Sequence, residues 1–338
     1  MTLRDNSKLT RRRFLSVAAT AAAGLIPTPS FALNREVRWR GVALGAQAEI
    51  RLVSPDEGHA RRVLAECRRE IERLEDILSL YRPHNTLVRL NRDGSVDDPE
   101  LELVEVLSTA RQVSDATGGA FDVSVQPLWQ LFADHFAEAS GDPAGPDNRA
   151  IAKARGLVDY RRIDISPRRI ALATPGMALT LNGIAQGFVT DRIARLLKRE
   201  GFADVLVDIG EISGHGRNSA GRPWRTGIAD PENPEAVISR AELADCSIAT
   251  SAPSGFRFRP GSPINHLFDP HSGRSAGAWR SVSVIASSAT VADAFSTAFS
   301  LMERARIETA LRSWPGLRVI LYSNDRRIVE LSSIVSRD

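Results

Sequence analysis

The sequence predicts an α+β fold in which mixed or antiparallel sheets are flanked by helices. Amphipathic helical segments and short strand-like segments both occur, but without the regular strand–helix–strand alternation that builds a parallel sheet. Turn signals at Ser166-Pro167 and Pro175-Gly176 separate short strand candidates and indicate antiparallel neighbours. The 338 residues are 43% hydrophobic and 25% charged, which is ordinary for a globular chain.

Five helices are predicted from apolar residues that recur at three- and four-residue steps. The clearest is the first, where an apolar stripe that includes Leu64, Cys67 and Ile71 opposes a charged face. Gly118 and Gly119 are expected to close the second helix. The predicted helices are 57–79, 99–119, 187–201, 287–302 and 304–314.

Strands are predicted where short apolar or alternating runs are bounded by turn residues. The first run, residues 35–54, is expected to form a strand or a hairpin. Two segments that contain Pro, Asn or Gly, 81–95 and 139–148, are predicted to be connections. The other strand predictions lie within 158–184, 203–217, 223–231, 246–252, 264–270, 280–288, 317–324 and 326–332.

Residues 1–32 predict a removable export signal rather than part of the fold. A basic start, an apolar stretch and the small residues around Ala32 form a secretory signal pattern, with cleavage expected after Ala32. The arginines 11–13, followed by Phe14 and Leu15, resemble a twin-arginine signal; an ordinary signal peptide is the alternative. The apolar part is too short to span a membrane, so no transmembrane segment is expected in the mature domain, residues 33–338.

The charge of the chain does not favour nucleic-acid binding. The whole sequence carries a formal net charge of +3, but the first 32 residues contain five Lys or Arg and one Asp. Without them the chain is close to neutral, so its basic character comes from the signal. The two cysteines, Cys67 and Cys246, are too few for a disulfide framework and are expected to be free and buried.

The segment 287–302, "SSATVADAFSTAFSLM", stacks an acid and a hydroxyl on a helix that is otherwise mostly apolar. Asp293 and Thr297 lie four residues apart, one turn above the other. One interpretation is a capping box, with Thr290 as the N-cap and Asp293 three residues later. The other is a site for a hard cation, because carboxylate and hydroxyl oxygens are suitable ligands. This segment alone leaves both open.

Several common catalytic signatures are not found. The glycines of "DIGEISGHGRNSAG" do not have dinucleotide-binding spacing, and the sequence contains no P-loop. No histidine has the spacing of a zinc motif, and there is no G-x-S-x-G elbow. His266 lies in "INHLFDPHSGR", which from local pattern is either an Asp-Pro turn after a strand or part of a site.

Five stretches, taken in order, resemble one family. They are "SLYRPHNTLVRLN", "TGGAFDVSVQPL", "LTLNGIAQGFVTDRIARLLKREGFADVLVDIGEI", "IATSAPSGFRF…INHLFDPHSGRSA" and "SVSVIASSATVADAFSTAF". They are similar to motifs of the ApbE family, the FAD:protein FMN transferases, such as A-L-V-N-L-G-G, H-I-I-D-P-x-T-G and A-D-A-x-S-T-A. The resemblance runs from about Gly41 to Leu321. It implies an ApbE-like fold with an FAD cleft between two subdomains.

The resemblance also implies a reaction and a metal site. Members split the diphosphate of FAD and transfer FMN to a Thr or Ser of a target protein, releasing AMP. Mg²⁺ is implied at Asp293, Thr297 and the backbone carbonyl of Gly183, a set of hard oxygen ligands. The catalytic residues that it implies are Asp293 and His266, the latter expected to help activate the acceptor hydroxyl.

Contacts with FAD are implied for eight residues of this chain. Tyr81 and Phe121 are expected to supply aromatic surface, and Asp122 to accept hydrogen bonds from the ligand. Thr180, Gln186, Leu44 and Ala46 depart from the residues usual in the family, and Gly183 replaces the usual Ala. The full set is Leu44, Tyr81, Ala120, Phe121, Asp122, Thr180, Gln186 and Leu267.

The expected partner is a flavoprotein of an electron-transfer chain that presents its acceptor residue to the periplasm, with nitrous-oxide respiration as one candidate. The acceptor pattern of such targets, D-G-x-S/T-x-A/S-S/T, is absent from this chain, which favours the modifying enzyme over its substrate. Two alternatives remain at this level. One is an FAD pyrophosphatase that releases FMN and AMP, and the other is a periplasmic flavin-binding protein without turnover.

Overall fold

The computed structural model describes residues 35–138, 141–275 and 277–333, and it confirms the α+β class. The centre is an eight-stranded sheet in the order β1-β2-β6-β7-β10-β11-β12-β13, and each neighbouring pair is antiparallel. Its strands are β1 (Arg35–Ala43), β2 (Ala46–Ser54), β6 (Val205–Asp208), β7 (Ile212–His215), β10 (Cys246–Ser251), β11 (Ser281–Ala286), β12 (Arg318–Tyr322) and β13 (Ile328–Ser332).

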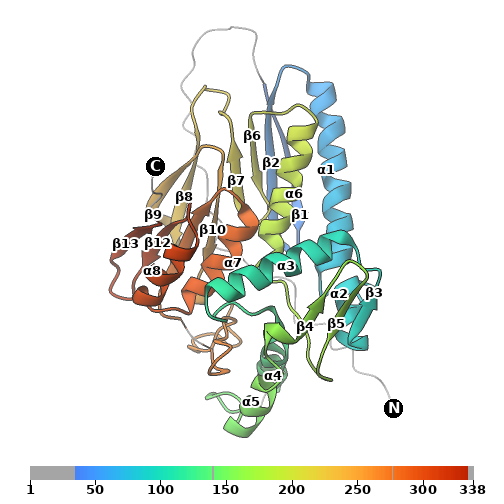
Figure 1. Ribbon diagram of the computed structural model, residues 1–338. Coiled ribbons are helices and arrows are strands. Elements are labelled where there is room, and N and C mark those ends of the chain that lie inside the picture. Colours follow the sequence, from blue (N-terminus) through green and yellow to red (C-terminus); the bar gives the residue numbers. More distant parts are fainter. Residues whose placement is uncertain (1–34, 139–140, 276, 334–338) are drawn as a thin grey trace.

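Helices cover one face of this sheet. The helix α1 (Glu57–Leu78) packs on β1 and β2, α6 (Ala185–Arg199) on β6 and β7, and α7 (Ala289–Ser300) on β10 and β11. The helix α3 (Leu101–Ala116) contacts both α1 and α7, and crosses below α6 and α7 in Figure 1. The short α8 (Arg304–Ser313) follows α7.

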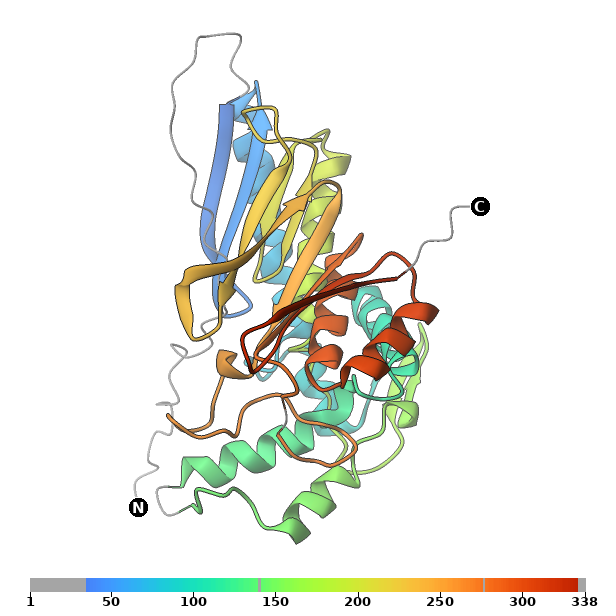
Figure 2. The same cartoon turned by 90° about the vertical axis from the view of Figure 1, so that its left-hand side faces the viewer.

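The opposite face of the sheet is covered by the hairpin β8 (Trp224–Asp230) and β9 (Asn233–Leu243), seen at the front of the sheet in Figure 2. Strand residues alternate between the two layers, as period-two geometry requires. On β11, Val284 packs with the helices whereas Ile285 packs with Trp224 of the hairpin. The central strands β6, β7, β11 and β12 are therefore buried on both faces over most of their length, whereas β1 and β13 keep many exposed residues.

A smaller region extends from the end of the helical layer (Figure 1). It contains a three-stranded antiparallel sheet and three helices, and the last two helices pack around a separate aromatic core that includes Phe132 and Phe268. Its elements are α2 (Thr86–Asp93), β3 (Ser95–Asp97), α4 (Gln126–Ala137), α5 (Asn148–Arg155), β4 (Ile163–Ile165) and β5 (Arg169–Leu172).

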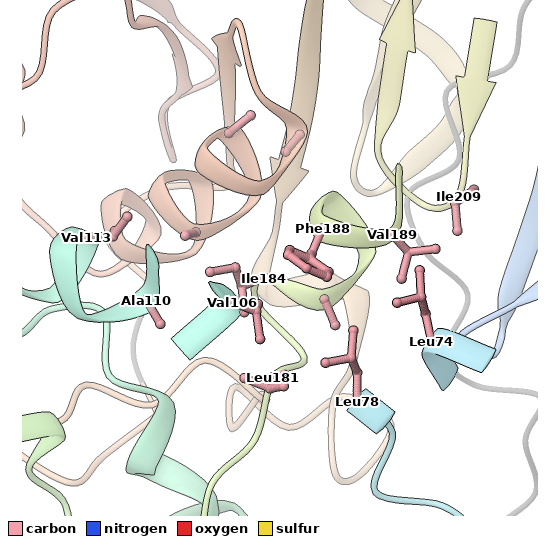
Figure 3. Close-up of a cluster of buried hydrophobic side chains, with 14 of the residues drawn as sticks. Leu74, Leu78, Val106, Ala110, Val113, Leu181, Ile184, Phe188, Val189 and Ile209 are labelled. Atoms are coloured by element: carbon pink, nitrogen blue, oxygen red, sulfur yellow. The ribbon is translucent and has the colours of Figure 1, made fainter. Parts of the chain in front are cut away.

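The main core lies where the segment before α6 meets α1 and α3. Figure 3 shows Leu74 and Leu78 of α1 near Val189 and Leu181, with Phe188 on the side of α6 that faces Ile184 and Val106. Leu74 and Val189 are fully buried, and Leu78 and Leu181 nearly so. This packing fixes the position of the 181–187 segment, which matters below because that segment begins the candidate site.

Most predicted elements are confirmed, but some local predictions are wrong. Residues 86–93 form α2 instead of a connection, because Leu87 and Leu90 are buried and Gly94 ends the helix with a φ of 76°. The segment 264–270 forms only isolated bridges, since the side chain of Asn265 accepts the N–H of Leu267 and bends the chain. The helices α4 and α5 and the strand β9 were not predicted.

The cysteines agree in part with expectation. Both are free thiols, and Cys67 is buried in α1. Cys246 is only partly buried, contrary to the prediction, because it is the first residue of β10 beside an exposed turn.

The predicted signal, residues 1–32, lies outside the described residues. Within the residues that the structure describes, no helix has the length and apolar character needed to cross a membrane.

Candidate active site

The candidate site begins where α6 and α7 approach each other unusually closely. Gly187 permits this approach, because a Cβ there would lie 2.2 Å from the carbonyl oxygen of Ala289 and 2.8 Å from Cβ of Asp293. The N–H of Gly187 donates to Oδ2 of Asp293 over 3.0 Å. The carboxylate of Asp293 therefore lies at the N-terminal end of α6, where backbone N–H groups favour negative charge.

Thr297 lies against the segment that precedes α6. A Cβ on Gly183 would be 2.8 Å from Oγ1 of Thr297, so the main chain of Gly183 directly faces this hydroxyl. On the other side, Oγ1 of Thr297 is 3.3 Å from Oγ of Ser251, at the end of β10. The structure thus brings together Gly183, Asp293 and Thr297, the three residues for which the sequence implied a metal site.

These three residues fit a hard divalent cation. They offer a carbonyl, a carboxylate and a hydroxyl oxygen, the donor types that Mg²⁺ prefers. The main chain of Gly183 packs directly against the side chain of Thr297, since a Cβ there would lie 2.8–3.3 Å from its atoms. Burial raises the pKa of Asp293 to about 7, and the groups that act on it are the Gly187 N–H and the Asp191 carboxylate, neither a cation. A bound cation would supply the missing positive charge.

The capping-box interpretation of this helix is wrong. The helix α7 begins at Ala289, and its N-cap is Ser288, whose Oγ accepts the N–H of Val291. Thr290 lies inside the first turn, and its hydroxyl donates to Oδ2 of Asp191 over 2.6 Å. Asp293 is one turn too far along the helix to cap it. Its buried carboxylate therefore needs another explanation, and the cation site provides one.

His266 lies in the irregular segment between β10 and β11 and is half-buried. Its Nδ1 is 3.2 Å from the carbonyl oxygen of Phe256, which also accepts the backbone N–H of His266. Since that carbonyl can only accept, Nδ1 carries the hydrogen and Nε2 keeps its lone pair. Burial lowers the pKa of His266, so the ring is neutral near pH 7. This is the form required of a general base.

Two predicted flavin-binding residues lie beside the C-terminal end of α1. Leu44 is at the tip of the β1–β2 hairpin with a φ of 49°, and its N–H donates to the carboxylate of Glu75 in α1. Tyr81 follows α1, and 65% of its surface is exposed. An exposed aromatic ring is available for stacking on a flavin or adenine ring. The contact itself remains a prediction.

The loop after α3 holds three more of the predicted residues, and it is mostly buried. Ala120 and Phe121 are each 4% exposed, so the ring of Phe121 is part of the core. Asp122 accepts the backbone N–H and the hydroxyl of Ser124 through Oδ1, and the N–H of Tyr160 through Oδ2. Phe121 and Asp122 therefore have roles within the fold, and their contacts with FAD remain predictions.

The last three predicted residues connect this loop to the metal side. The N–H of Thr180 donates to the carbonyl of Val123 over 2.8 Å, which joins the loop to the segment before Gly183. The side chain of Gln186 lies against Gly210, where a Cβ would be 2.4 Å from Nε2 of Gln186. Leu267 is buried next to His266 in sequence. The predicted residues thus lie on several elements, and their contacts join Val123, Gly210 and Thr297 to the 180–187 segment.

Comparison with known proteins assigns the family. The model of the ApbE family matches residues 44–321. The chain belongs to the ApbE family. A relative from Treponema pallidum, named FAD:protein FMN transferase, is 29% identical over 90% of this chain and 89% of its own length. A relative from Salmonella typhimurium with the same name is 28% identical over 83% and 82% of the two lengths.

Solved ApbE structures have the same fold. The flavin transferase ApbE from Vibrio cholerae superimposes with a TM-score of 0.76 at 25% identity, covering 88% of this chain and 97% of its own. The apbe protein from Thermotoga maritima gives a TM-score of 0.77 at 23% identity, covering 87% and 96%. The mixed helical and antiparallel architecture described above is therefore the ApbE fold.

One acidic feature of this ApbE chain was missed by sequence reasoning. Where the family pattern has V-N-L-G-G, this chain has "VDIGE". Asp208 is the last residue of β6, and Glu211 lies between β6 and β7. Glu211 is 8% exposed, and its Oε2 accepts the N–H of Thr250 over 3.3 Å. Burial, Asp293 and Asp208 together raise the pKa of Glu211 well above its usual value. Comparison of the motifs residue by residue would have revealed this second acid beside Asp293.

A second polar cluster has distances reminiscent of a catalytic triad but is not available for catalysis. Oγ of Ser213 is 3.1 Å from Nε2 of His215, whose Nδ1 is 3.4 Å from Oδ1 of Asp245. Ser213 is only 1% exposed, and its Oγ also accepts the hydroxyl of Ser247 across the β7–β10 pair. A substrate carbonyl cannot reach this hydroxyl, so the cluster stabilises the sheet.

Proposed function

We propose that this ApbE chain is a Mg²⁺-dependent FAD:protein FMN transferase that works in the periplasm. The observation that carries the proposal is the junction of Gly183 with Asp293 and Thr297, a buried site of hard oxygen ligands held between two packed helices. The curated relatives bear the transferase name and align over most of both lengths, which supports the same reaction here.

The proposed reaction exchanges one phosphorus–oxygen bond for another. The hydroxyl oxygen of a Thr or Ser on the acceptor attacks the phosphorus on the FMN side of the FAD diphosphate. The bond from this phosphorus to the bridging oxygen breaks, AMP leaves with that oxygen, and FMN stays on the acceptor as a phosphoester. The hydroxyl proton must go to a base, and Nε2 of His266 has the free lone pair that this role needs.

The residues of the site have separate roles in this reaction. Gly183, Asp293 and Thr297 would hold Mg²⁺, which neutralises diphosphate oxygens and so stabilises the transition state. Tyr81 offers its exposed ring to the flavin or adenine end of FAD. His266 is neutral at physiological pH because its burial lowers its pKa, which suits it to accept the proton of the attacking hydroxyl.

The proposed location rests on the sequence of residues 1–32. The consecutive arginines 11–13 before an apolar stretch favour the twin-arginine route, which exports folded proteins. The acceptor is then an exported or periplasm-facing flavoprotein of an electron-transfer chain, with nitrous-oxide respiration as one candidate. Replacing Arg11 and Arg12 by Lys should keep the protein in the cytoplasmic fraction, whereas Arg4→Lys should not. Normal export of the double variant would indicate an ordinary signal peptide.

The reaction is tested with the purified protein, FAD, Mg²⁺ and an acceptor that carries the D-G-x-S/T-x-A/S-S/T pattern. We expect an acceptor band that is fluorescent in a denaturing gel, and one AMP released for each flavin bound. The matched control is the acceptor with its central Ser or Thr replaced by Ala. Free FMN and AMP with an unlabelled acceptor would indicate a pyrophosphatase, and intact FAD would indicate a binding protein without turnover.

A further inference from the structure

Asp191, in the second turn of α6, binds the start of α7 through four hydrogen bonds. Its Oδ1 accepts the N–H of Ala289 over 2.8 Å, and its Oδ2 accepts the N–H of Thr290 over 2.9 Å. The hydroxyls of Ser288 and Thr290 also donate to Oδ2, each over 2.6 Å. No sequence pattern singled out this residue, because its partners lie about 100 residues away.

These bonds satisfy groups that a helix cannot satisfy by itself. The first N–H groups of a helix have no partner within it. In α7, Ser288 accepts the N–H of Val291, and Asp191 accepts the two N–H groups before it. Carboxylate charge at a helix N-terminus is also favourable. The first turn of α7 is therefore fixed by a side chain that belongs to another helix.

The same two helices carry the two halves of the proposed cation site. Gly183 lies two residues before the start of α6, next to its N-cap Ile184, and Asp293 and Thr297 lie on α7. Asp191 follows Gly187 by four residues, so both lie on the face of α6 that contacts α7. Asp191 holds α7 at its first turn, and Gly187 holds it one turn further on through Asp293. A slip of α7 along α6 would separate Thr297 from Gly183.

We propose that Asp191 is a positioning residue for this cation site. It fixes the position of α7 along the axis of α6 and the rotation of α7 about its own axis. In this way it keeps the oxygens of Asp293 and Thr297 facing the Gly183 carbonyl. It touches neither the cation nor the substrate. The inference deepens the proposed function, because the cation is the one required for FMN transfer, but its main readout is cation affinity and not transfer.

The first test compares Asp191→Ala and Asp191→Asn with the wild-type protein. Mn²⁺ serves as the probe, and its binding is followed by electron paramagnetic resonance in the presence of FAD. Loss of a residue that orients metal ligands weakens metal affinity by about 10- to 100-fold. We expect a loss in this range for Ala and a smaller one for Asn, which keeps one acceptor oxygen. Asp147→Ala, which removes the N-cap of α5, is the matched control and should leave Mn²⁺ affinity unchanged.

A kinetic measurement separates a role in positioning the metal ligands from a general loss of active structure. With Mg²⁺ titrated at saturating FAD and acceptor, Asp191→Ala should raise the apparent KM for Mg²⁺ by a similar factor, about 10- to 100-fold. The kcat at saturating Mg²⁺ should stay within a few-fold of wild type. A lower kcat with an unchanged Mg²⁺ requirement would overturn the proposal.

Variants on the α7 side cover the case in which Asp191→Ala does not fold. Thr290→Val removes one hydroxyl donor to Asp191 with little change of shape, and Thr290→Ser keeps it. We expect weaker Mn²⁺ binding for Val and near wild-type binding for Ser. Equal affinities for both variants, within twofold of wild type, would contradict the role of Asp191.

The outcomes also separate this inference from the function itself. If the wild-type protein binds Mn²⁺ but transfers no FMN, the proposed function fails while the affinities of the variants still decide the role of Asp191. Absence of Mn²⁺ binding by the wild-type protein with FAD present would overturn both.

Discussion

The two sides of the candidate site are built in contrasting ways. The cation side consists of the N-terminal end of α6 and the first turns of α7, joined by the Gly187–Asp293 and Asp191–Thr290 hydrogen bonds. The substrate side consists of residues between regular elements, with His266 in the irregular segment after β10 and Tyr81 just past α1. Asp293 is 4% exposed, whereas Tyr81 is 65% exposed.

This contrast matches what each side must do. A small cation requires oxygens at fixed separations, and rigid packed helices provide them. FAD and a protein acceptor are large, and they need surface that is open before binding. Loss of a metal ligand on the cation side should therefore reduce transfer most. On the substrate side, loss of the base should reduce it less, and loss of one FAD contact least. The following predictions test that ranking from the largest effect to the smallest.

Asp293→Asn should reduce FMN transfer most. The amide oxygen can still accept the Gly187 N–H, so the helices should stay packed, but the charge that attracts the cation is lost. Stabilisation by a metal ion is worth several kcal/mol, which corresponds to about a thousandfold or more in kcat/KM. The measurement is acceptor labelling at saturating FAD, with circular dichroism as the folding control. Transfer within tenfold of wild type would remove Asp293 from the cation site.

His266→Gln should slow transfer by about a hundredfold or more, the usual loss when a general base is removed. Gln keeps a polar side chain but has no basic nitrogen at the Nε2 position. The KM for FAD should change little, because His266 is assigned to the acceptor proton and not to FAD binding. His271→Gln, in the same irregular segment, is the control and should retain nearly full activity. Equal rates for the two variants would refute the base assignment.

The pH dependence of transfer by the wild-type protein should show the same base. Because burial lowers the pKa of His266 from 6.5, the ring stays neutral down to a lower pH than an exposed histidine would. At saturating Mg²⁺, where the bound cation would keep Asp293 ionised, the rate should therefore be constant near pH 7 and fall about tenfold per pH unit only below the lowered pKa of His266. The measurement is kcat/KM for the acceptor between pH 5 and 8, in about half-unit steps. An acid limb centred above pH 6.5 would contradict this.

Gly187→Ala should destabilise the protein by about 1–3 kcal/mol, the usual range for overpacking. The new methyl group would collide with the backbone of Ala289 and with Asp293, neither of which is free to move. Gly58→Ala is the control, since it makes the same change in α1, where the new Cβ would come no closer than 3.3 Å to the Asp56 side chain. Urea unfolding should show a clear loss for Gly187→Ala and none for Gly58→Ala. Equal stability would mean that the α6–α7 contact is looser than described.

Tyr81→Ala should have the smallest effect, a several-fold rise in the KM for FAD. Loss of one aromatic contact is worth about 0.5–1.5 kcal/mol, and an exposed side chain contributes little to folding. Tyr81→Phe keeps the ring and should behave like wild type. The comparison of KM values distinguishes ring stacking from a role of the hydroxyl, which would instead affect both variants alike.

Much of the fold was predictable because its signals are local. The long α1 and the β1–β2 hairpin follow from periodicity and turn residues alone. The errors occur where a distant partner decides the local structure. Thr290 looked like a helix cap, but Asp191 binds its hydroxyl, and Ser288 takes the cap.

The candidate site shows the same limit. Gly183, Asp293 and Thr297 were implied by resemblance to motifs, and the structure then placed them together. Periodicity cannot show that Gly187 touches Asp293, because 106 residues separate them in sequence. It also cannot show that Phe121 is buried and that Asp122 is bound within its own loop. These facts depend on packing between elements that only the folded chain brings together.

The position of the first hairpin in the sheet has a consequence for biosynthesis. Strand β2 pairs with β6, where Leu52 lies opposite Val205, so the hairpin emerges from the ribosome long before its partner strand exists. At ordinary translation rates this delay is roughly ten to thirty seconds. During that time the free edge of β2 is exposed to other chains. For the export proposed above, this order of strands favours a route that carries the chain after synthesis has ended, because earlier targeting would deliver an incomplete sheet.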